Sequence, residues 1–211
     1  MADVDAERIR VNLERVRERI AAAGRDPGEV TVCAAVKYLP AQSMQALAEG
    51  GIEVVGENRA QALIEKQEVA GRDAFDWHFI GALQSRKVRD VAPRVSLIHS
   101  VASDSALKQL GKHPVRAVLV QVNVAGEGGK EGIAPQELAS FIDRCPVPVT
   151  GLMTMPPFAE RAEDSRRWFA ALADLAAEHG LRELSMGTTQ DFEVAAAEGA
   201  TIVRLGTVLY A

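Results

Sequence analysis

At 211 residues, with 47% hydrophobic and 25% charged residues, the chain has the size and composition of one globular domain. A net charge of −5 argues against nucleic acid as the main partner, and no apolar run approaches the length of a membrane span. The two cysteines, Cys33 and Cys145, form neither a disulfide framework nor a metal-binding pattern, so we expect a reducing, cytoplasmic environment and no metal.

The first predicted element is an amphipathic helix over Asp3–Ala23. Its apolar residues recur at spacings of four, three and four, which places them on one face: Ile9, Leu13, Val16 and Ile20. The charged residues between them alternate in sign, as on a solvated helix face. Gly24 ends the helix, and Asp26–Gly28 turns the chain into the first strand.

From residue 30 onward, strand and helix patterns alternate. The predicted strands are Val30–Lys37, Glu53–Val55, Trp77–Ile80, Leu97–Val101, Ala117–Asn123, Val147–Met153, Glu183–Met186 and Thr201–Leu205. Helical patterns lie between them at Ala41–Glu49, Arg59–Ala70, Ser85–Val91, Asp104–Lys112, Pro135–Arg144, Ala162–His179 and Gln190–Glu198. Strands separated by helices pair in parallel, because antiparallel neighbours need only short turns. The sequence therefore predicts an α/β fold, a (β/α)8 TIM barrel with an extra N-terminal helix, as a single domain over residues 1–211. An open doubly wound sheet is the alternative.

Lys37 lies at the carboxyl end of the first predicted strand, whose run from Val30 to Val36 is apolar apart from Thr31. A lysine at the edge of a buried sheet is partly desolvated, which favours a neutral amine that attacks carbonyl compounds. The simpler alternative is that Lys37 extends its ammonium group to water at a strand end.

Polar residues also follow the other predicted strands, at the end of a barrel where active sites form. Ser185–Thr189 and Gly206–Thr207 are small, hydroxylated loops after the last two strands, the usual phosphate corner of such barrels. Glycine there lets the backbone approach phosphate oxygens closely. An aldehyde-reactive lysine facing a phosphate corner indicates one ligand with both groups, and pyridoxal 5′-phosphate (PLP) fits that description.

Six segments of the chain together resemble the pyridoxal phosphate homeostasis protein family, whose fold is that of the alanine racemase N-terminal barrel. They follow the family's order along nearly the whole chain: Ala34–Lys37, Gly56–Gln61, Trp77–Gln84, Gly151–Met155, Leu184–Gly187 and Val203–Thr207.

The resemblance implies a role for particular residues in holding PLP. Lys37 would carry the cofactor as a Schiff base, Asn58 would lie near the phenolic oxygen of the ring, and Arg204 would face the pyridine nitrogen. The phosphate would be held by Ser185, Gly206 and Thr207, helped by backbone N–H groups around Met186 and Gly187. His78, in the third predicted strand, is a further candidate contact.

The chain departs from the family pattern at several positions. Ala82 stands where many relatives carry histidine, and Val36 replaces a hydroxyl residue before the lysine. Thr188-Thr189 takes the place of a frequent Met-Ser pair, which keeps hydroxyl groups but leaves the phosphate donors open. Because only Val208–Ala211 follow Thr207, we expect little structure to support that loop.

Three functions remain open from the sequence. We prefer a non-catalytic PLP carrier; the second is a PLP-dependent, racemase-like enzyme of low activity or a Schiff-base aldolase that uses Lys37, and the third is a plain scaffold, which predicts a colourless protein without cofactor. A guanidinium facing the pyridine nitrogen makes the ring a poorer electron sink, and racemisation needs an acid/base group on each face of the α-carbon. The resemblance implies that in alanine racemase the second group comes from a second domain, for which we expect no room in 211 residues. His78 could substitute, although a strand histidine between Trp77 and Phe79 is more often a packed core residue.

We expect a monomer that binds PLP and delivers it to apo forms of PLP-dependent enzymes, with no nucleic acid or membrane partner. Lys130 lies in the glycine-rich stretch Gly126–Gly132 and is a second amine near the predicted barrel mouth. A mobile, solvated lysine is the simpler interpretation. Met153 and Met155 are expected to pack the end of the barrel.

Overall fold

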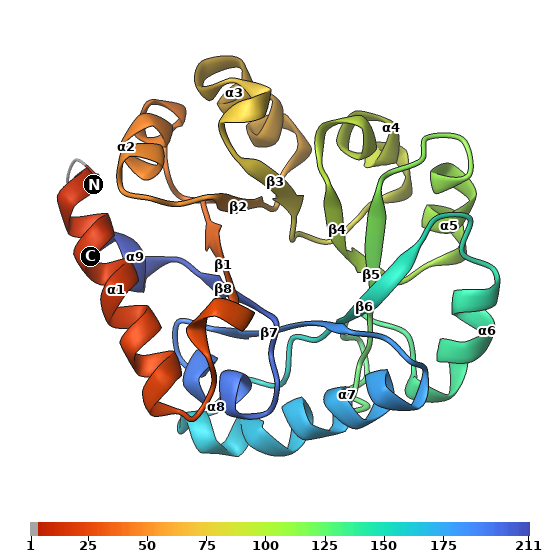
Figure 1. Ribbon diagram of the computed structural model, residues 1–211. Coiled ribbons are helices and arrows are strands. Elements are labelled where there is room, and N and C mark those ends of the chain that lie inside the picture. The colour runs from red at the N-terminus through yellow and green to blue at the C-terminus, as the bar shows by residue number, and fades with distance from the viewer. Residues whose placement is uncertain (1–3) are drawn as a thin grey trace.

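The computed structural model, which describes residues 4–211, is a closed barrel of eight parallel strands surrounded by helices (Figure 1). The strands are β1 Thr31–Ala35, β2 Val54–Glu57, β3 Asp76–Phe79, β4 Leu97–Val101, β5 Ala117–Gln121, β6 Val149–Met153, β7 Glu183–Thr188 and β8 Ile202–Leu205. Each strand pairs with the next along the chain, and β8 closes the barrel against β1, with Val203 opposite Val32. The predicted (β/α)8 barrel is confirmed, and the open sheet is excluded.

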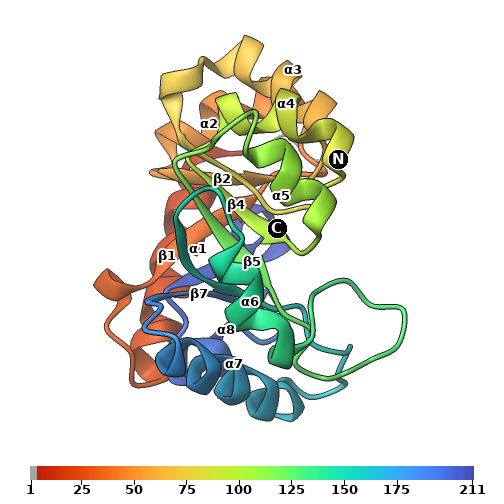
Figure 2. The ribbon, with the colours of Figure 1, turned by 90° about the vertical axis from the view of Figure 1, so that its right-hand side faces the viewer.

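Helices cover the outside of the barrel (Figures 1 and 2). They are α1 Ala6–Ala22, α2 Met44–Glu49, α3 Ala60–Ala70, α4 Val88–Val91, α5 Asp104–Leu110, α6 Leu138–Asp143, α7 Arg166–Glu178, α8 Phe192–Ala197 and α9 Thr207–Tyr210. The predicted start of the first helix at Asp3 lies outside the described residues. Asp5 caps α1, because its carboxylate accepts hydrogen bonds from the backbone N–H groups of Glu7 and Arg8. Within residues 4–211, no helix is long and apolar enough to cross a bilayer.

The end of the chain is more structured than the sequence predicted. Residues after Thr207 form the short helix α9, which packs beside α1 (Figure 1). The buried Asn12 of α1 donates hydrogen bonds from Nδ2 to the carbonyl oxygens of Leu209 and Ala211, at 3.3 and 3.1 Å. The prediction of an unsupported loop was wrong because the supporting contacts come from the opposite end of the sequence.

Alternate residues of each strand point into the barrel, because side chains along a strand alternate between its two faces. Residues near the amino ends line a hollow at what we call the lower mouth: Thr31, Val54, Asp76, Leu97, Ala117, Glu183 and Ile202. Two positions further along, buried side chains lie at the next level of the barrel: Cys33, His78, His99, Leu119, Ser185 and Arg204. Another two positions on, Ala35, Asn58, Ile80 and Gly206 reach the carboxyl ends, which we call the upper mouth.

β1 is shorter than predicted, so Lys37 lies in the turn that follows it. The strand ends at Ala35, although the backbone N–H of Val36 still donates to the carbonyl of Gly56 in β2. The N–H of Leu39 then bonds back to the carbonyl of Val36, which turns the chain away from the sheet. Lys37 is therefore held between a strand end and a tight turn, over the upper mouth.

A buried ion pair on the outer face of the barrel holds the ends of β1 and β2 together. The ammonium of Lys66 in α3 contacts the carboxylate of Glu57 and donates a 2.6 Å hydrogen bond to the carbonyl of Val36. The same carboxylate accepts hydrogen bonds from the backbone N–H groups of Asn58 and Arg59, at 2.7 and 3.1 Å. Because the side chains of Glu57 and Lys66 are 0% and 4% exposed, this contact positions the turns that carry Lys37 and Asn58.

Replacing Lys66 with methionine removes the cation and leaves the buried carboxylate of Glu57 without a counter-charge. We expect the free energy of unfolding to fall by about 3–5 kcal/mol, measured by chemical denaturation. The control is Lys87→Met, which removes an exposed lysine 3.9 Å from Asp90 and should cost less than about 1 kcal/mol. Equal losses in the two variants would show that the buried pair does not stabilise the barrel.

Candidate functional site

A cavity of about 690 Å³ opens at the upper mouth, where the carboxyl ends of the strands meet. It is lined by residues from both ends of the chain and from the loops after several strands: Val4, Arg8, Ala35, Lys37, Tyr38, Leu39, Asn58, Ile80, Gly81, Met155, Thr188, Thr189, Gln190, Arg204, Gly206, Thr207, Tyr210 and Ala211. Its size suits a small aromatic ligand, and its position is where barrels of this type carry their binding sites.

The structure brings five of the nine predicted site residues together in this cavity: Lys37, Asn58, Arg204, Gly206 and Thr207. The other four, His78, Ser185, Met186 and Gly187, are buried in the strands below and do not line it. The hydroxyl of Ser185 is already bonded to His99 and Arg204, and His78 lies nearer the lower mouth. Direct contact of these four residues with a ligand stays a prediction.

Lys37 presents an amine to the cavity at the edge of solvent. Its side chain is partly buried, and its Nζ lies 4.8 Å from the ring centre of Tyr38, which is 72% exposed. The guanidinium of Arg59 reaches the carbonyl of Lys37 at 3.5 Å. The backbone of Lys37 is thus held from the β2 side, while the amine is available to a ligand.

Asn58 contributes a polar atom that the protein itself does not satisfy. Its Oδ1 is buried and has no hydrogen-bond partner within the described part of the chain. Gly81 packs directly on this residue, because a Cβ at position 81 would lie 2.3 Å from the Asn58 carbonyl oxygen. A buried acceptor that lacks a donor carries a free-energy cost, so a ligand donor at this point is favoured.

Arg204 is a buried cation on the floor of the cavity, only 6% exposed. Its guanidinium donates to the carbonyls of Ser185 and Thr154, at 2.8 and 2.9 Å, and to the hydroxyl of Ser185. No carboxylate of residues 4–211 lies within 4.0 Å of it. Burial lowers the pKa of Arg204 to about 10, so the group is still charged at neutral pH and favours an electron-rich ligand atom.

Small hydroxylated residues form the opposite side of the cavity. The backbone N–H of Gly206 donates to Oγ1 of Thr189 at 3.3 Å, which joins the loops after β7 and β8. The hydroxyl of Thr188 is turned away and donates to Asp191 at 3.1 Å. The side chain of Arg8, from α1, completes this side with a positive charge. This corner can bind an anion such as a phosphate group.

Several cavity residues were not assigned by the sequence. Arg8 was placed on a solvated helix face, because nothing in the helix pattern shows that α1 borders the upper mouth. Met155, expected to pack, is 52% exposed and lines the cavity, whereas Met153 is buried inside the barrel as predicted. The order of the strands around a closed barrel would have predicted that α1 lies near β8. It would not have predicted that α1 reaches the level of the cavity.

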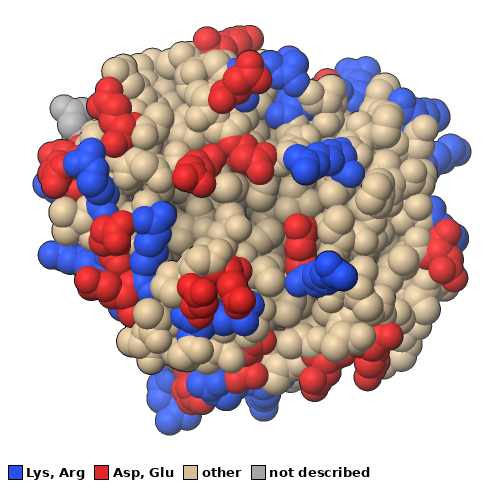
Figure 3. All heavy atoms as spheres, viewed as in Figure 1, with Lys and Arg blue, Asp and Glu red and all other residues tan. Residues whose placement is uncertain are grey.

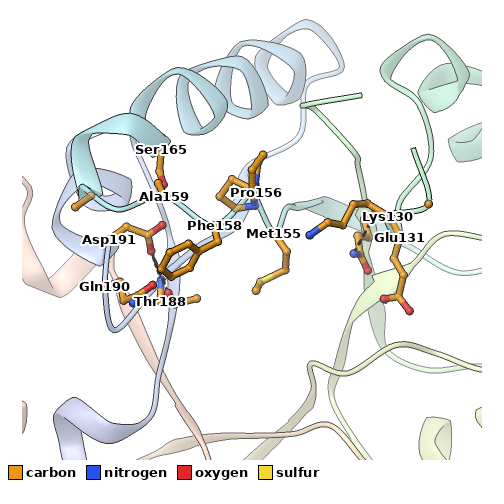
Figure 4. A pocket seen from close by; sticks show the side chains of 14 residues that line it. Lys130, Glu131, Met155, Pro156, Phe158, Ala159, Ser165, Thr188, Gln190 and Asp191 are labelled. Carbon is orange, nitrogen blue, oxygen red and sulfur yellow. Dashed lines mark hydrogen bonds between the residues drawn. The ribbon is translucent and has the colours of Figure 1, made fainter. Parts of the chain in front are cut away.

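A second hollow adjoins the first and shares Met155, Thr188 and Gln190 with it (Figure 4). Figure 4 shows Lys130 on one side and Phe158 on the other, with Met155 between them. Lys130 lies 3.9 Å from Glu127, in the loop between β5 and α6 that extends away from the barrel in Figure 2. It therefore borders the neighbouring hollow and not the cavity that holds Lys37.

We looked to two features of the described residues for a second functional site: the charges on the face shown in Figure 3, and clusters of side chains that could bind a metal ion. Positive and negative side chains are interspersed on the face shown in Figure 3. Residues 4–211 contain no group of three or more histidine, cysteine, aspartate or glutamate side chains placed to bind a metal ion.

Residues 4–211 match the family model of the alanine racemase N-terminal domain. The chain is 38% identical to a pyridoxal phosphate homeostasis protein of Aquifex aeolicus, covering 97% of this chain and 96% of the relative. It is 39% identical to one from Pseudomonas aeruginosa, with 97% and 94% covered. Its fold matches PipY of Synechococcus elongatus, solved with PLP bound, with a TM-score of 0.76 and 31% identity over 93% of this chain and all of PipY. With eight parallel strands closed into a barrel and relatives of this identity along nearly its whole length, the chain belongs to the pyridoxal phosphate homeostasis protein family.

Proposed function

We propose that this chain binds PLP in the upper-mouth cavity, holds it as a Schiff base on Lys37, and serves in PLP homeostasis. The observation that carries the proposal is the set of groups in one cavity: an accessible amine, a buried guanidinium with no carboxylate partner among residues 4–211, a buried amide oxygen without a donor, and a hydroxylated, positively charged corner. The relatives named pyridoxal phosphate homeostasis protein, and the structure of PipY with PLP, support it.

The residues present fit the chemical groups of PLP. The aldehyde needs a primary amine, and Lys37 is the only lysine that lines the cavity within residues 4–211. The pyridine nitrogen is an acceptor, and the guanidinium of Arg204 only donates. The phosphate needs N–H and hydroxyl donors and positive charge, which Thr189, Gly206 and Arg8 supply together.

When bound, PLP supplies an electrophilic aldehyde and an electron-accepting ring. The protein's own residues determine how much of that capacity is used. Arg204 keeps its proton, so it offers a hydrogen bond to the ring nitrogen and does not protonate it. The electron sink is therefore weakened, which favours holding the cofactor over carbanion chemistry.

The lining of the cavity also favours a carrier over a racemase. Proton transfer at a substrate α-carbon needs a positioned acid or base on each face. No histidine, aspartate or glutamate side chain of residues 4–211 lines the cavity. Burial raises the pKa of the Tyr210 phenol, whose hydroxyl donates to the carbonyl of Ala35, so this tyrosine is a poor base. His78, the alternative considered above, is separated from the cavity by the barrel interior.

As part of the same proposal, the protein acts as a cytoplasmic monomer and passes PLP to apo forms of PLP-dependent enzymes. A Schiff base suits this use because imine formation is reversible in water. The exposed Tyr38 beside Lys37 marks the side from which water and a recipient can approach.

Borohydride reduction of the purified protein tests the assignment of Lys37. We expect peptide mass mapping to find a pyridoxyl adduct on Lys37, and Lys37→Ala to lose the covalent yellow chromophore. The matched control is Lys130→Ala, which removes the amine in the adjoining hollow and should keep both adduct and colour. A Lys37→Ala protein that still carries covalently attached chromophore would contradict the assignment.

Replacing Arg8 with glutamine removes one positive charge from the proposed phosphate corner. Because this charge is exposed, we expect a modest effect, a two- to fivefold weaker affinity by the usual scale of about 1 kcal/mol or less for such contacts. Absorbance titration of apo-protein with PLP measures it. Arg10→Gln is the control: Arg10 lies in the same helix but pairs with Glu7 and does not line the cavity, so its removal should leave the affinity unchanged.

Exchange of the amino-acid α-proton separates carrier from enzyme. Holo-protein is mixed with alanine in deuterated water, and deuterium incorporation is followed by NMR. For a carrier we expect exchange no faster than with PLP and a free amine, because Lys37 lacks a partner base in the cavity. Exchange at turnover-like rates that is lost in Lys37→Ala would establish the racemase-like alternative.

A further inference from the structure

A line of polar side chains, buried except for Asp76 at its lower end, crosses the barrel below the cavity. His99 of β4 contacts Ser185 Oγ through Nδ1 at 2.8 Å and His78 Nδ1 through Nε2 at 3.0 Å. His78 Nε2 lies 3.4 Å from Oδ2 of Asp76 at the lower mouth, and Ser185 Oγ accepts a hydrogen bond from Arg204 at the cavity floor. We call these five residues, Asp76, His78, His99, Ser185 and Arg204, the polar relay.

The Asp76 end of the polar relay determines where every hydrogen lies. An ionised Asp76 can only accept, so His78 carries its hydrogen on Nε2 and leaves Nδ1 as an acceptor. His99 therefore carries its hydrogen on Nε2 and donates it to Nδ1 of His78. The Nδ1 of His99 then accepts the hydroxyl hydrogen of Ser185, whose oxygen accepts from Arg204. With both histidines neutral, no other arrangement gives every contact one donor and one acceptor.

We propose that His99 and His78 are positioning residues for Arg204, and that protonation of His78 at the lower mouth reverses the direction of the polar relay. A doubly protonated His78 donates from Nδ1 to His99 Nε2. His99 must then carry its hydrogen on Nδ1 and donate it to Ser185, whose oxygen accepts from both His99 and Arg204. The hydroxyl hydrogen of Ser185 then loses its acceptor within the relay, which is the cost of the reversed arrangement. The relay gains one proton and loses none, and His99 changes tautomer without becoming charged.

The surrounding charges decide which histidine takes the proton. The charged or titratable groups that face the pair are Asp76, Glu29, Glu183 and Arg116 around the lower mouth, and Cys33 and Arg204 in the interior. His78 borders the lower mouth, where three of these groups are acidic, and contacts Asp76. His99 is fully buried, and burial together with the charges of His78 and Arg204 lowers its pKa well below the usual value for histidine. The added proton therefore belongs on His78.

This coupling reaches the proposed ligand through Ser185. In the neutral relay, Ser185 Oγ accepts from Arg204 and passes its hydrogen on. In the protonated relay, the same oxygen is shared between two donors, so its bond to Arg204 weakens. This step rests on the proposed function, in which Arg204 faces the pyridine nitrogen. Protonation at the opposite end of the barrel then changes the hydrogen bonding around the ring.

The relay itself can be tested on the apo-protein, without PLP. Nitrogen-15 NMR of labelled histidine distinguishes the two neutral tautomers and the cation. The chain has four histidines, so His113→Gln and His179→Gln assign the two outside the relay. We expect His78 and His99 both to be Nε2–H tautomers at pH 8. As the pH falls, His78 should become doubly protonated while His99 changes to the Nδ1–H tautomer.

An Nδ1–H tautomer of His99 at pH 8, a His99 cation at low pH, or an unchanged His99 tautomer when His78 is protonated would each overturn the proposal. A purely structural role for the histidines predicts that last result. Ser185→Ala is the variant that cuts the relay beside Arg204, and its folding is checked independently by circular dichroism. In this variant we expect His99 to keep its Nε2–H tautomer at pH 8, because Asp76 still fixes His78 as the acceptor for His99 Nε2, whereas a change at His78 no longer reaches Arg204 through a hydroxyl.

The holo-protein tests the effect on the ligand. We expect the visible absorption of the bound chromophore to include a pH-dependent shift with the same midpoint as the NMR change. His78→Gln should remove that shift while the chromophore stays attached to Lys37, and His113→Gln should keep it. A shift that survives in His78→Gln would overturn the coupling to the ligand. A colourless protein with the expected tautomers would instead contradict the proposed function and leave the relay supported by the NMR result.

Discussion

The buried positive charge of Arg204 is the interaction around which the interior of this barrel is arranged. Transferring a guanidinium from water to a position 6% exposed is costly unless its N–H groups find acceptors. The barrel supplies neutral oxygens from Ser185 and Thr154 and no carboxylate within 4.0 Å among the described residues. The hydrogen-bonding needs of the cation are thus met while its charge is not cancelled. That leaves an attractive field for an electron-rich atom on the cavity side, and on the other side the cation donates to the hydroxyl oxygen of Ser185, which contacts His99.

On the outer face of the same barrel, buried charges are neutralised by an ion pair. Glu57 and Lys66 neutralise each other, and their remaining hydrogen bonds are made to the backbone of the turns around Val36 and Asn58. The charged groups of this pair are therefore not available to a ligand. Strand alternation separates the two cases. The inward positions keep something for the cavity, an unsatisfied amide oxygen at Asn58 and a charge without a carboxylate partner at Arg204, whereas the outward position 57 is used to hold the turns in place. The positions of the cavity residues therefore depend on the ion pair between Glu57 and Lys66, which does not line the cavity.

The sequence predicted the barrel, the position of Lys37 and the two hydroxylated loops, because each depends on a local pattern: a β-branched run, a strand end, a glycine with hydroxyl neighbours. It predicted strand β4 at its observed bounds and the others to within a few residues. What it missed depends on contacts between distant segments. No role was assigned to His99 from the sequence, although its place two positions after Leu97 and its inward direction follow from alternation once the strand register is known. The places of Arg8 and α9 depend on the closed barrel, which brings the first and last helices together.

Closure of the barrel also determines when the cavity is complete. Residues from α1, from the turn after β1 and from the loop after β8 line one cavity, so the complete site exists only when β8 is paired with β1. A ligand that binds this arrangement and not the unfolded chain stabilises it by about 2.7 kcal/mol when present at 100 times its dissociation constant. The same closure packs α9 against α1: Leu209 is buried in the core, and the amide of Asn12 donates to the carbonyls of Leu209 and Ala211. Completion of the cavity and the packing of the last helix against the first therefore depend on the same pairing of β8 with β1.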